Sequence, residues 1–581
     1  MITHSVKQKM VLALVGTTLP ASAFDDYFFF GDSLSDSGNL NLSSGGFLPG
    51  MGYPGPTFSN GLTWAGYTDP SARNFIELST SMTPTTGSVN FAFGGAETAS
   101  GGAPPGLLDQ VNTHLPSVTP LVEIDADDVA AVWAGANDLM GAAPGTEQAT
   151  AAAATTNIAT AVSNLANVHG FKNIYVFNLP DLGTTPRSIM GGPAAQAGAS
   201  QLSSFFNSSL SAKVGAVAAD ANITLIDVNA LLSDAVANPT AYGISIVDAS
   251  ANPNAGSGVP STLTPAQEAE YLFYDEIHPT TNAHEIIAAY VAAHSSMSQR
   301  AEELNLSTDA ALAMDDRFGF ETLGLKKGSS RLNAELYSHE TGAGMSKRTT
   351  EGAKVDLDFG ITDHLSIGGE FFYAKGNTSG ADYDAIGFGM DAALTGTTGN
   401  LLWEVGGGIG FSTGDLTRDH NIGTLSSDST QHVSVLTLHA ALRNDNLEIG
   451  GRKAYWELGV KQRLVYRDAR RENGGGSLDL AYDSESIYTT IANIEFGIAL
   501  TNTVTFELAL NPVLFHDGGE IHARQTSGLG AFSISDYTGY DSHTARIGLS
   551  AQVSDNATIG ASVVIGDDDT LGGNIGATIN F

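Results

Sequence analysis

From about residue 331 to the end of the chain, apolar and polar residues alternate, and this period of two constrains the fold more than any other sequence feature. Alternation of this kind is typical of strands that have one apolar face. Twelve such segments can be counted, near residues 331–340, 352–360, 364–375, 383–394, 401–411, 432–443, 453–466, 488–500, 503–516, 541–553, 557–566 and 571–581. Each has about the length of a tilted strand that crosses a membrane, which is roughly 9–11 residues. The pattern predicts a 12-stranded antiparallel transmembrane β-barrel.

The links between these segments also alternate in length. Short links fall at residues 361–363, 395–400, 501–502 and 554–556, an intermediate one at 444–452, and long ones at 412–431, 468–487 and 517–540. Barrels of the outer membrane have short periplasmic turns and long outer loops. If the last strand ends in the periplasm, all the long links lie outside the cell. A soluble β-sandwich is the alternative, and the even strand number and the order of loop lengths argue against it.

The chain ends on an alternating run, residues 575–581, whose last residue is the aromatic Phe581. This run resembles the signal by which outer-membrane barrels are recognised for assembly. We therefore expect two partners for this half of the chain: the barrel assembly machinery during insertion, and the lipids of the outer membrane afterwards.

The first 23 residues are typical of a secretion signal peptide. Lys7 and Lys9 give a positive start, residues 10–19 form a short apolar core, and residues 21–23 form a small-x-small cleavage site. An uncleaved membrane anchor is the alternative, but the apolar core is much shorter than the ~20 residues that span a bilayer. We expect cleavage after Ala23.

Residues 24–295 have a different organisation, in which short apolar strands alternate with helical stretches. The strands are expected at residues 27–30, 89–93, 129–134, 174–177 and 223–227, and the helices at 150–168, 200–219 and 283–294. Strand–helix alternation predicts an α/β fold with a parallel sheet that helices cover on both faces.

Residues 30–39 read Phe-Gly-Asp-Ser-Leu-Ser-Asp-Ser-Gly-Asn, so an apolar strand stops at a turn that can lift the hydroxyl of Ser33 toward a substrate. A serine hydroxyl is a weak nucleophile at neutral pH and needs a nearby base. The chain offers His278, which follows Asp275 by three residues. Two further blocks, residues 90–96 and 133–138, also follow apolar strands, and ligands bind at the carboxyl ends of strands in an open α/β sheet.

These four blocks, in this order, resemble the GDSL (SGNH) family of esterases and lipases. Residues 58–64 and 178–183 extend the resemblance over the whole of residues 24–295. The resemblance implies an SGNH-hydrolase, flavodoxin-like parallel sheet. It also implies that Ser33 is the nucleophile, that His278 is the general base and that Asp275 orients the imidazole.

The resemblance further implies an oxyanion hole, made by the backbone amides of Ser33 and Gly95 and the side-chain amide of Asn137. Gly94 is an alternative to Gly95, because motif alignment alone makes the choice. Ser33 does not lie in the Gly-x-Ser-x-Gly turn of the common α/β-hydrolases.

Residues 296–330 join the two halves and contain an expected helix at 299–312 that can fill the pore. Because the first barrel strand starts in the periplasm, this segment must run inward from outside the cell. The enzyme half would then lie on the cell surface, as in a type V autotransporter. No Asn-Asn or Asn-Asp cleavage pair occurs between 296 and 330, so we expect an uncleaved passenger. The whole chain resembles the GDSL esterase autotransporters of Gram-negative bacteria, with a signal peptide (1–23), an esterase passenger (24–295), a linker (296–330) and a barrel (331–581).

Composition restricts the partners. The net charge of −36, from 62 acidic and 26 basic residues, argues against nucleic acid. The chain has no cysteine and therefore no disulfide or thiolate metal site. The pair His284-Glu285 lacks the second histidine of a zinc motif, so we expect no metal and no cofactor. We expect a monomer that acts on an acyl ester or lipid.

Three functions remain open. The first is a carboxylesterase or lipase, a serine hydrolase of the ester-bond class EC 3.1.1, and the second is a lysophospholipase or a carbohydrate O-deacetylase. The third is a surface adhesin or scaffold that keeps the esterase fold without activity. The combination of Ser33, Asn137, Asp275 and His278 argues against the third, because a binding module does not need all four. We expect loops such as residues 45–56 and 248–263 to form the walls of the substrate groove.

Overall fold

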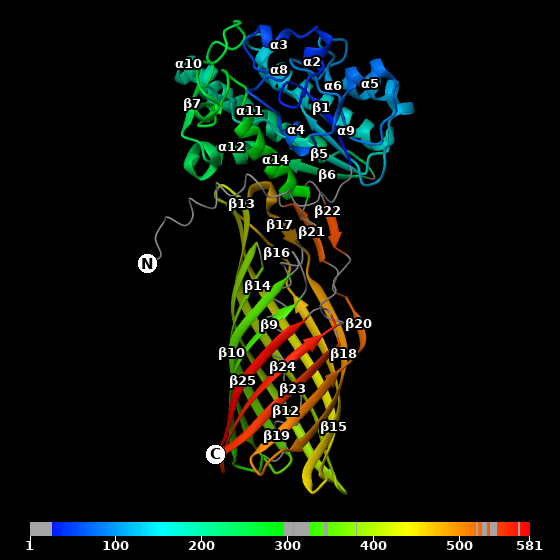
Figure 1. The fold of residues 1–581 in the computed structure, drawn as a ribbon, viewed down its shortest axis with the longest axis vertical. Coiled ribbons are helices and arrows are strands. Elements are labelled where there is room, and N and C mark those ends of the chain that lie inside the picture. Colours follow the sequence, from blue (N-terminus) through cyan, green and yellow to red (C-terminus); the bar gives the residue numbers. More distant parts are fainter. Residues whose placement is uncertain are drawn as a thin grey trace.

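The computed structural model describes residues 26–219, 221–295, 306, 325–341, 347–378, 380–518, 521–525, 531–534, 543–567 and 570–581. An α/β domain lies at one end of a long β-barrel, and the C-terminus lies at the other end (Figure 1). The predicted signal peptide at 1–23 and all but one residue of the predicted pore helix at 299–312 lie outside the described residues.

The α/β domain is built on a six-stranded parallel sheet with the order β2-β3-β1-β4-β5-β6. Its strands are β1 (Tyr27–Gly31), β2 (Arg73–Asn74), β3 (Val89–Asn90), β4 (Val129–Trp133), β5 (Asn173–Phe177) and β6 (Asn222–Ile226). The chain passes from β1 to β3 on one side and then to β4 on the other, so its direction reverses between β1 and β4. This is the flavodoxin-like order, and ligands bind in the crevice at such a reversal. The predicted parallel sheet is confirmed.

The longer helices of this domain are amphipathic. The helices are α2 (Asn39–Ser43), α3 (Phe47–Gly50), α4 (Trp64–Thr68), α5 (Phe75–Ser81), α6 (Leu107–Asp109), α7 (Leu115–Val118), α8 (Ala136–Gly141), α9 (Glu147–Asn167), α10 (Pro186–Met190), α11 (Pro193–Val214), α12 (Val228–Ala237), α13 (Pro265–Glu268) and α14 (Thr281–Ser295). In α9 the buried residues recur every three or four positions, as in Ala151, Ala154 and Ile158. The helix predicted at 200–219 begins earlier, because Pro193 suits a first helical turn, and ends earlier, before Gly215. No described helix is both long and apolar enough to cross a membrane.

The barrel is a closed antiparallel sheet. Its strands are β9 (Ser330–Thr341), β10 (Arg348–Gly360), β11 (Leu365–Asn377), β12 (Ala381–Thr398), β13 (Leu401–Ile422), β14 (Leu425–Ile449), β15 (Arg452–Arg467), β18 (Glu485–Ala499), β19 (Val504–Asn511) with β20 (Val513–Asp517), β23 (Thr544–Ser554), β24 (Ala557–Gly566) and β25 (Leu571–Asn580). The segments β19 and β20 are two parts of one strand, since both pair with β18 and only Pro512, which lacks a backbone N–H, separates them. The first strand, β9, pairs with the last, β25. The predicted 12-stranded barrel is confirmed.

The barrel is apolar outside and polar inside. On β10, Val355, Leu357 and Phe359 are exposed, whereas Asp356 and Asp358 between them are buried. A soluble protein would bury the first set and expose the second. This inverted arrangement, together with closure that leaves no unpaired edge, is that of an outer-membrane barrel.

Four of the predicted links are wholly or partly strands. The predicted long loop at 412–431 is the upper part of β13 and β14, which continue as a hairpin to Ile422 and Leu425. The predicted link at 444–452 belongs mostly to β14 and β15. The long links after β15 and β20 contain β16 (Arg470–Arg471), β17 (Leu480–Tyr482), β21 (Ile521–Gln525) and β22 (Ala531–Ile534), which form a small sheet. Polar residues such as Asp415 and Thr417 point outward in the hairpin, so the apolar alternation stops although the backbone pairing continues.

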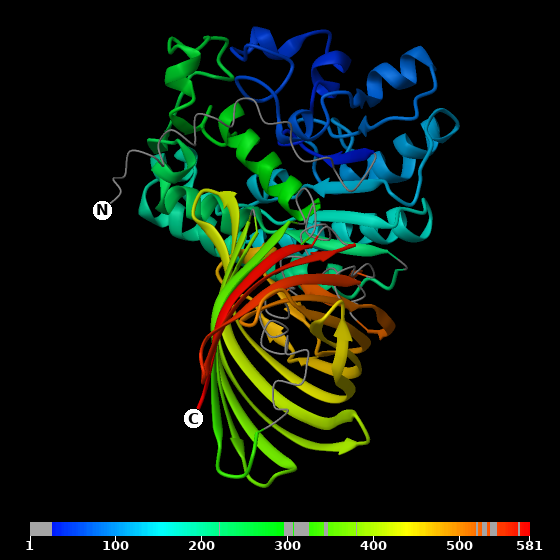
Figure 2. The same ribbon diagram turned by 60° about the horizontal axis from the view of Figure 1, so that its bottom comes forward.

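The hairpin and the small sheet lie between the barrel and the α/β domain (Figures 1 and 2). At the opposite end, Phe581 exchanges two backbone hydrogen bonds with Ser330, of 2.8 and 3.2 Å, and so completes the closure of the barrel. Leu306 is the one described residue between 296 and 324, and it is fully buried against Gly376 of β11.

Candidate active site

The end of β1 fixes the position of the predicted nucleophile, Ser33. Gly31 has a φ of +146°, and a Cβ atom there would lie 1.9 Å from the carbonyl oxygen of Trp133, so only glycine fits. The side-chain amide of Gln110 binds both the N–H and the C=O of Gly31, each at 2.8 Å. The chain then turns sharply, and Ser33 lies at the carboxyl end of β1, beside the reversal of the sheet.

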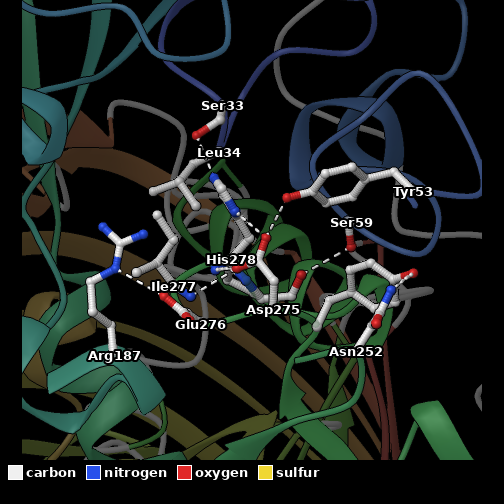
Figure 3. A network of polar contacts seen from close by, with 12 residues as sticks. Ser33, Leu34, Tyr53, Ser59, Arg187, Asn252, Asp275, Glu276, Ile277 and His278 are labelled. Carbon is white, nitrogen blue, oxygen red and sulfur yellow. Dashed lines mark hydrogen bonds and ion pairs between the residues drawn. The ribbon is translucent and has the colours of Figure 1, made fainter. Parts of the chain in front are cut away.

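The three residues predicted to act together meet in one hydrogen-bonded row (Figure 3). Ser33 Oγ lies 2.8 Å from His278 Nε2, and His278 Nδ1 lies 2.6 Å from Asp275 Oδ2. An ionised carboxylate can only accept, so His278 Nδ1 carries a proton and donates it to Asp275. His278 Nε2 is therefore free to accept the proton of the Ser33 hydroxyl.

Asp275 is held as an anion. Its Oδ1 accepts the backbone N–H groups of Ile277 and His278 at 2.8 and 2.7 Å, and its Oδ2 accepts the hydroxyl of Tyr53 at 2.6 Å. Burial alone raises the pKa of a carboxyl group, but the charge of His278 and the hydrogen bonds from His278 and Tyr53 lower the pKa of Asp275 to about 2. The carboxylate is therefore ionised at neutral pH.

Tyr53 was not identified from the sequence. It lies in the predicted loop 45–56, and its partner Asp275 is 222 residues away along the chain. Its ring also packs against the ring of Tyr274, with centroids 5.8 Å apart. No local pattern around Tyr53 indicates this contact, so only the folded structure reveals it.

Residues 58–64, which the resemblance included without a role, hold the loop that carries His278. The ring of Phe58 stacks on the imidazole of His278, with centroids 5.1 Å apart. Ser59 Oγ donates to the carbonyl of Pro279 at 2.9 Å, and Asn60 Oδ1 accepts the N–H of Thr281 at 2.7 Å. The imidazole is thus fixed from both its face and its backbone.

The predicted oxyanion groups differ in the hydrogen bonds that they already make. The N–H of Gly94 donates to Asp36 Oδ2 at 2.8 Å, whereas the N–H groups of Ser33 and Gly95 have no hydrogen-bond partner among the residues that the structure describes. Asn137 Nδ2 donates one hydrogen to the carbonyl of Ala96 at 3.0 Å and carries a second. Asn137 lines the same pocket as Ser33 and His278.

Asp36 links the loop after β1 to the loop after β3. Its carboxylate accepts the N–H groups of Gly38, Asn39, Leu40 and Gly94. Burial is the largest influence and raises the pKa of Asp36 to about 6, although these four bonds lower it. The sequence did not indicate this role.

A pocket opens from Ser33 and His278 into the domain, and most of its wall is apolar. The wall includes Leu34, Met140, Leu182, Leu232, Phe273 and Ile277. The expectation that loops 45–56 and 248–263 form the walls is wrong for this pocket, whose lining comes from neither loop. Those loops instead pack on each other, since Gly256 N–H donates to the carbonyl of Met51 at 2.8 Å.

Asp32 also lines the pocket, next to Ser33. Its Oδ1 accepts the N–H of Leu34 at 3.1 Å, and its Oδ2 is buried without a partner in the described part of the chain. Burial raises the pKa of Asp32 to about 7. In the described ranges, no group of three His, Asp or Glu side chains is placed to hold a metal ion.

Comparison with solved structures finds autotransporter barrels. The translocator domain of autotransporter NalP from Neisseria meningitidis matches 50% of this chain and 97% of its own length, at 12% identity and a TM-score of 0.33. The transport unit of the autotransporter AIDA-I from Escherichia coli matches 48% of this chain and 99% of its own length, at 14% identity and a TM-score of 0.33. The description of the barrel given above depends on this chain's own strand pairing.

Comparison with known sequences concerns the α/β domain. Phosphatidylcholine-sterol acyltransferase of Aeromonas hydrophila is 30% identical over 248 residues, which cover 40% of this chain and 69% of the relative. Esterase EstA of Pseudomonas aeruginosa is 36% identical over 125 residues, which cover 20% of this chain and 19% of the relative. Residues 27–291 match the family described as GDSL-like Lipase/Acylhydrolase. The chain belongs to this GDSL-like lipase/acylhydrolase family.

Proposed function

We propose that the chain is a serine esterase that hydrolyses carboxylic esters with an apolar acyl chain. The observation that carries this proposal is the continuous row of hydrogen bonds from Ser33 through His278 to Asp275, at the mouth of an apolar pocket. The relatives found include an acyltransferase and an esterase, and either activity begins by taking an acyl group from an ester.

In the first half of the reaction, Ser33 Oγ attacks the ester carbonyl while His278 Nε2 takes the hydroxyl proton. Asp275 keeps the Nδ1 proton of His278 in place and stabilises the imidazolium that forms. His278 then gives the proton to the leaving alcohol, which leaves an acyl group on Ser33. In the second half, His278 takes a proton from water, the hydroxide attacks the acyl group, and the acid departs as Ser33 regains its proton.

The tetrahedral intermediate carries a negative oxygen that needs donors already aimed at it. We assign these donors to the N–H groups of Ser33 and Gly95 and to Asn137 Nδ2. Gly95 is preferred over Gly94 because the N–H of Gly94 already binds Asp36. The φ of Gly95, +78°, is in the left-handed region that favours glycine.

The apolar character of the pocket supports an ester with an apolar acyl group among the functions that the sequence left open. Eleven of the residues that line it are apolar, so an acyl chain gains free energy on entering, at about 25 cal/mol per Å² of buried apolar surface. A non-catalytic scaffold has no need of an aligned Ser33–His278 pair.

We also propose that the barrel displays this esterase on the cell surface. The α/β domain lies at the barrel end opposite Phe581, where the long links are found (Figure 1). With residues 1–23 removed as a signal peptide, residues 24–295 would form the passenger, 296–330 the linker through the pore and 331–581 the barrel. The buried position of Leu306 beside Gly376 supports a linker that runs inside the barrel. The passenger would stay attached, and the protein would act as a monomer.

Washed whole cells that express the full chain test both proposals at once. They should hydrolyse p-nitrophenyl esters, with a preference for medium over acetyl chains, and Ser33→Ala cells with equal surface protein should not. A fluorophosphonate probe should label Ser33 alone. Labelling of Ser35 or Ser37, or full activity in the Ser33→Ala cells, would contradict the assignment.

A further inference from the structure

One basic side chain lies beside the pocket, in a domain that has very few. The lysines and arginines of residues 26–295 are Arg73, Lys172, Arg187 and Lys213. Arg73 binds the carbonyl of Thr83, and Lys213 binds Thr155 and Thr156, both through contacts outside the pocket. Lys172 directly precedes β5, so it lies at the amino end of the sheet. Arg187 alone of the four lies at the carboxyl end, on α10.

Arg187 is joined to the walls of the pocket. Its Nε lies 3.3 Å from Glu276 Oε2, and its Nη1 lies 3.3 Å from Met140 Sδ. Its backbone N–H donates to the carbonyl of Glu276 at 3.0 Å. Met140 lines the pocket, as do Ile277 and His278, which follow Glu276 in sequence. The guanidinium therefore lies at the rim, beside Ile277 (Figure 3).

The guanidinium is available to a ligand. The side chain of Arg187 is 51% exposed and that of Glu276 is 41% exposed, so water screens their contact and either group can accept another partner at low cost. Nη2 has no hydrogen-bond partner among the described residues, and Nη1 has only the weak thioether acceptor. A guanidinium with free N–H groups on one edge matches the paired oxygens of a phosphate.

The neighbouring charges suit a headgroup that carries both signs. The domain has a large excess of carboxylates, which repels anions in general. Arg187 offsets this repulsion at the pocket rim only, and Glu276 places a negative charge directly beside it. A phosphate with a nearby ammonium group complements this pair, whereas a neutral sugar or glycerol headgroup does not.

We propose that Arg187 binds the phosphate of a zwitterionic lysophospholipid whose acyl chain lies in the pocket, and that Glu276 faces the ammonium end. This inference rests on the proposed esterase function and names its substrate class. Arg187 acts here on the substrate headgroup and takes no part in the chemical steps at Ser33.

The test compares two substrates that share one acyl chain, lysophosphatidylcholine and the uncharged monoacylglycerol, with the detergent-solubilised full chain. In Arg187→Gln, the ratio of kcat/KM for lysophosphatidylcholine to kcat/KM for monoacylglycerol should fall ~10-fold, mainly because KM for lysophosphatidylcholine rises. This change corresponds to the loss of about 1.4 kcal/mol of binding. Arg187→Lys should give an intermediate ratio, because it keeps the positive charge but loses the paired N–H groups of the guanidinium. Arg73→Gln, which changes an arginine of the same domain away from the pocket, is the matched control and should leave the ratio unchanged.

Glu276→Gln separates headgroup binding from a structural role of the ion pair. This substitution should weaken the binding of lysophosphatidylcholine and strengthen the binding of an anionic headgroup such as that of lysophosphatidic acid. Equal losses on both substrates in Arg187→Gln, or no loss on either, would overturn the inference. If the unmodified chain hydrolyses monoacylglycerol but not lysophosphatidylcholine, the headgroup inference fails and the esterase stands. If it hydrolyses no ester at all, the proposed function itself fails.

Discussion

At the scale of single residues, the hydroxyl of Tyr53 extends the row of hydrogen bonds from Ser33 by one further member. It donates to Asp275 at 2.6 Å from a loop that is otherwise remote from the chemistry. Because an ionised carboxylate with four donors is fixed in place, loss of the Tyr53 donor allows Asp275 and the bound imidazole to move. Tyr53 is therefore a positioning residue, since it acts on the reaction through Asp275.

Tyr53→Phe should lower kcat about 10-fold and leave KM nearly unchanged, as expected for one hydrogen bond to a charged group. The pKa of Asp275 should also rise, because that hydrogen bond helps to lower it. Steady-state kinetics and the ¹³C chemical shift of the Asp275 carboxyl as a function of pH measure the two effects. Tyr274→Phe is the matched control, because its hydroxyl donates to the carbonyl of Gly52 instead. Equal losses in the two variants would indicate a packing effect.

Asn137 carries a prediction of different size. If its second Nδ2 hydrogen stabilises the oxyanion, Asn137→Ala should lower kcat by a factor on the order of 10²–10³. Ester hydrolysis by variants with equal surface protein measures this. An unchanged kcat in Asn137→Ala would exclude the assignment, and the oxyanion would then depend on the N–H groups of Ser33 and Gly95 alone.

The sequence predicted those residues of the site that lie in short blocks, and it missed those that act across the fold. The structure brings Ser33 and Asn137 together because β1 and β4 are neighbouring parallel strands whose carboxyl ends lie at one edge. Asp275 and His278 reach the same site from the loop that precedes α14. Tyr53, Gln110 and Asp36 act on backbone groups or side chains that only the tertiary fold brings near. Gln110, for example, binds Gly31 from 79 residues away.

At the scale of secondary-structure elements, the barrel and the α/β domain meet through a small set of hydrogen bonds that we name the domain contact. Ser477, in the link after β15, contacts Asp227, Tyr290 and His294 of the α/β domain. Gln525 of β21 binds both the N–H and the C=O of Leu225, at 3.1 Å each. Because β6 is the edge strand of the parallel sheet, Gln525 satisfies backbone groups that would otherwise lack a partner.

The imidazole of His294 is neutral in this contact. Its Nδ1 lies 2.8 Å from the carbonyl of Tyr290 and must donate to it, so its Nε2 accepts the hydroxyl of Ser477 at 2.9 Å. Burial lowers the pKa of His294 from the ordinary 6.5 to about 4. Between these two values the unfolded chain binds more protons than the folded one, so stability falls as the pH decreases from about 6.5 to about 4 and is unaffected by this group above that range.

We predict that His294→Gln reduces this loss of stability on acidification. The titration of His294 changes the free energy of unfolding by at most about 3 kcal/mol, at 1.36 kcal/mol for each unit of difference in pKa. The measurement is the temperature at which the full chain loses esterase activity, taken at pH 7 and pH 4.5. His364→Gln, which replaces an exposed histidine in a barrel turn outside the domain contact, serves as the control and should behave like the unmodified chain. An identical pH dependence in His294→Gln would show that His294 does not titrate with the contact.

The boundaries of helices and strands were predictable where apolar residues recur with a period of two or of 3.6 residues. They were less predictable where no such period exists. The twelve barrel strands follow from alternation, which lipid on one side and the pore on the other impose. The β13–β14 hairpin was predicted as a loop because its outward-facing residues, such as Asp415 and Thr417, are polar, so the alternation that marks the other strands stops there. The small sheet β16-β17-β21-β22 was missed because its strands are short and pair across two separate links.

At the scale of the whole molecule, the plan of two halves was visible in the sequence, but their docking was not. The domain contact joins residues 250 and 300 positions apart, and no pattern within either half indicates it. The tip of the β13–β14 hairpin adds a further bond, from Thr424 Oγ1 to Asp234 Oδ2 at 2.7 Å. The two halves are therefore joined by direct contacts as well as by the linker, which agrees with a passenger that stays attached.

The last prediction concerns how the whole molecule reaches and spans the membrane. Phe581 closes the barrel by pairing with Ser330, and every backbone group in a lipid-facing sheet must be paired. Deletion of Phe581 should therefore reduce the amount of barrel that resists unfolding on heating in detergent, whereas activity per assembled molecule should persist, because Ser33 lies at the other end of the protein. Phe515→Ala, which removes another exposed aromatic ring of the barrel but leaves closure intact, is the control.

Protease added to intact cells should cleave within residues 24–295 and spare residues 331–581. If cleavage requires a broken outer membrane, the α/β domain faces the periplasm, and the orientation proposed from the loop lengths is reversed.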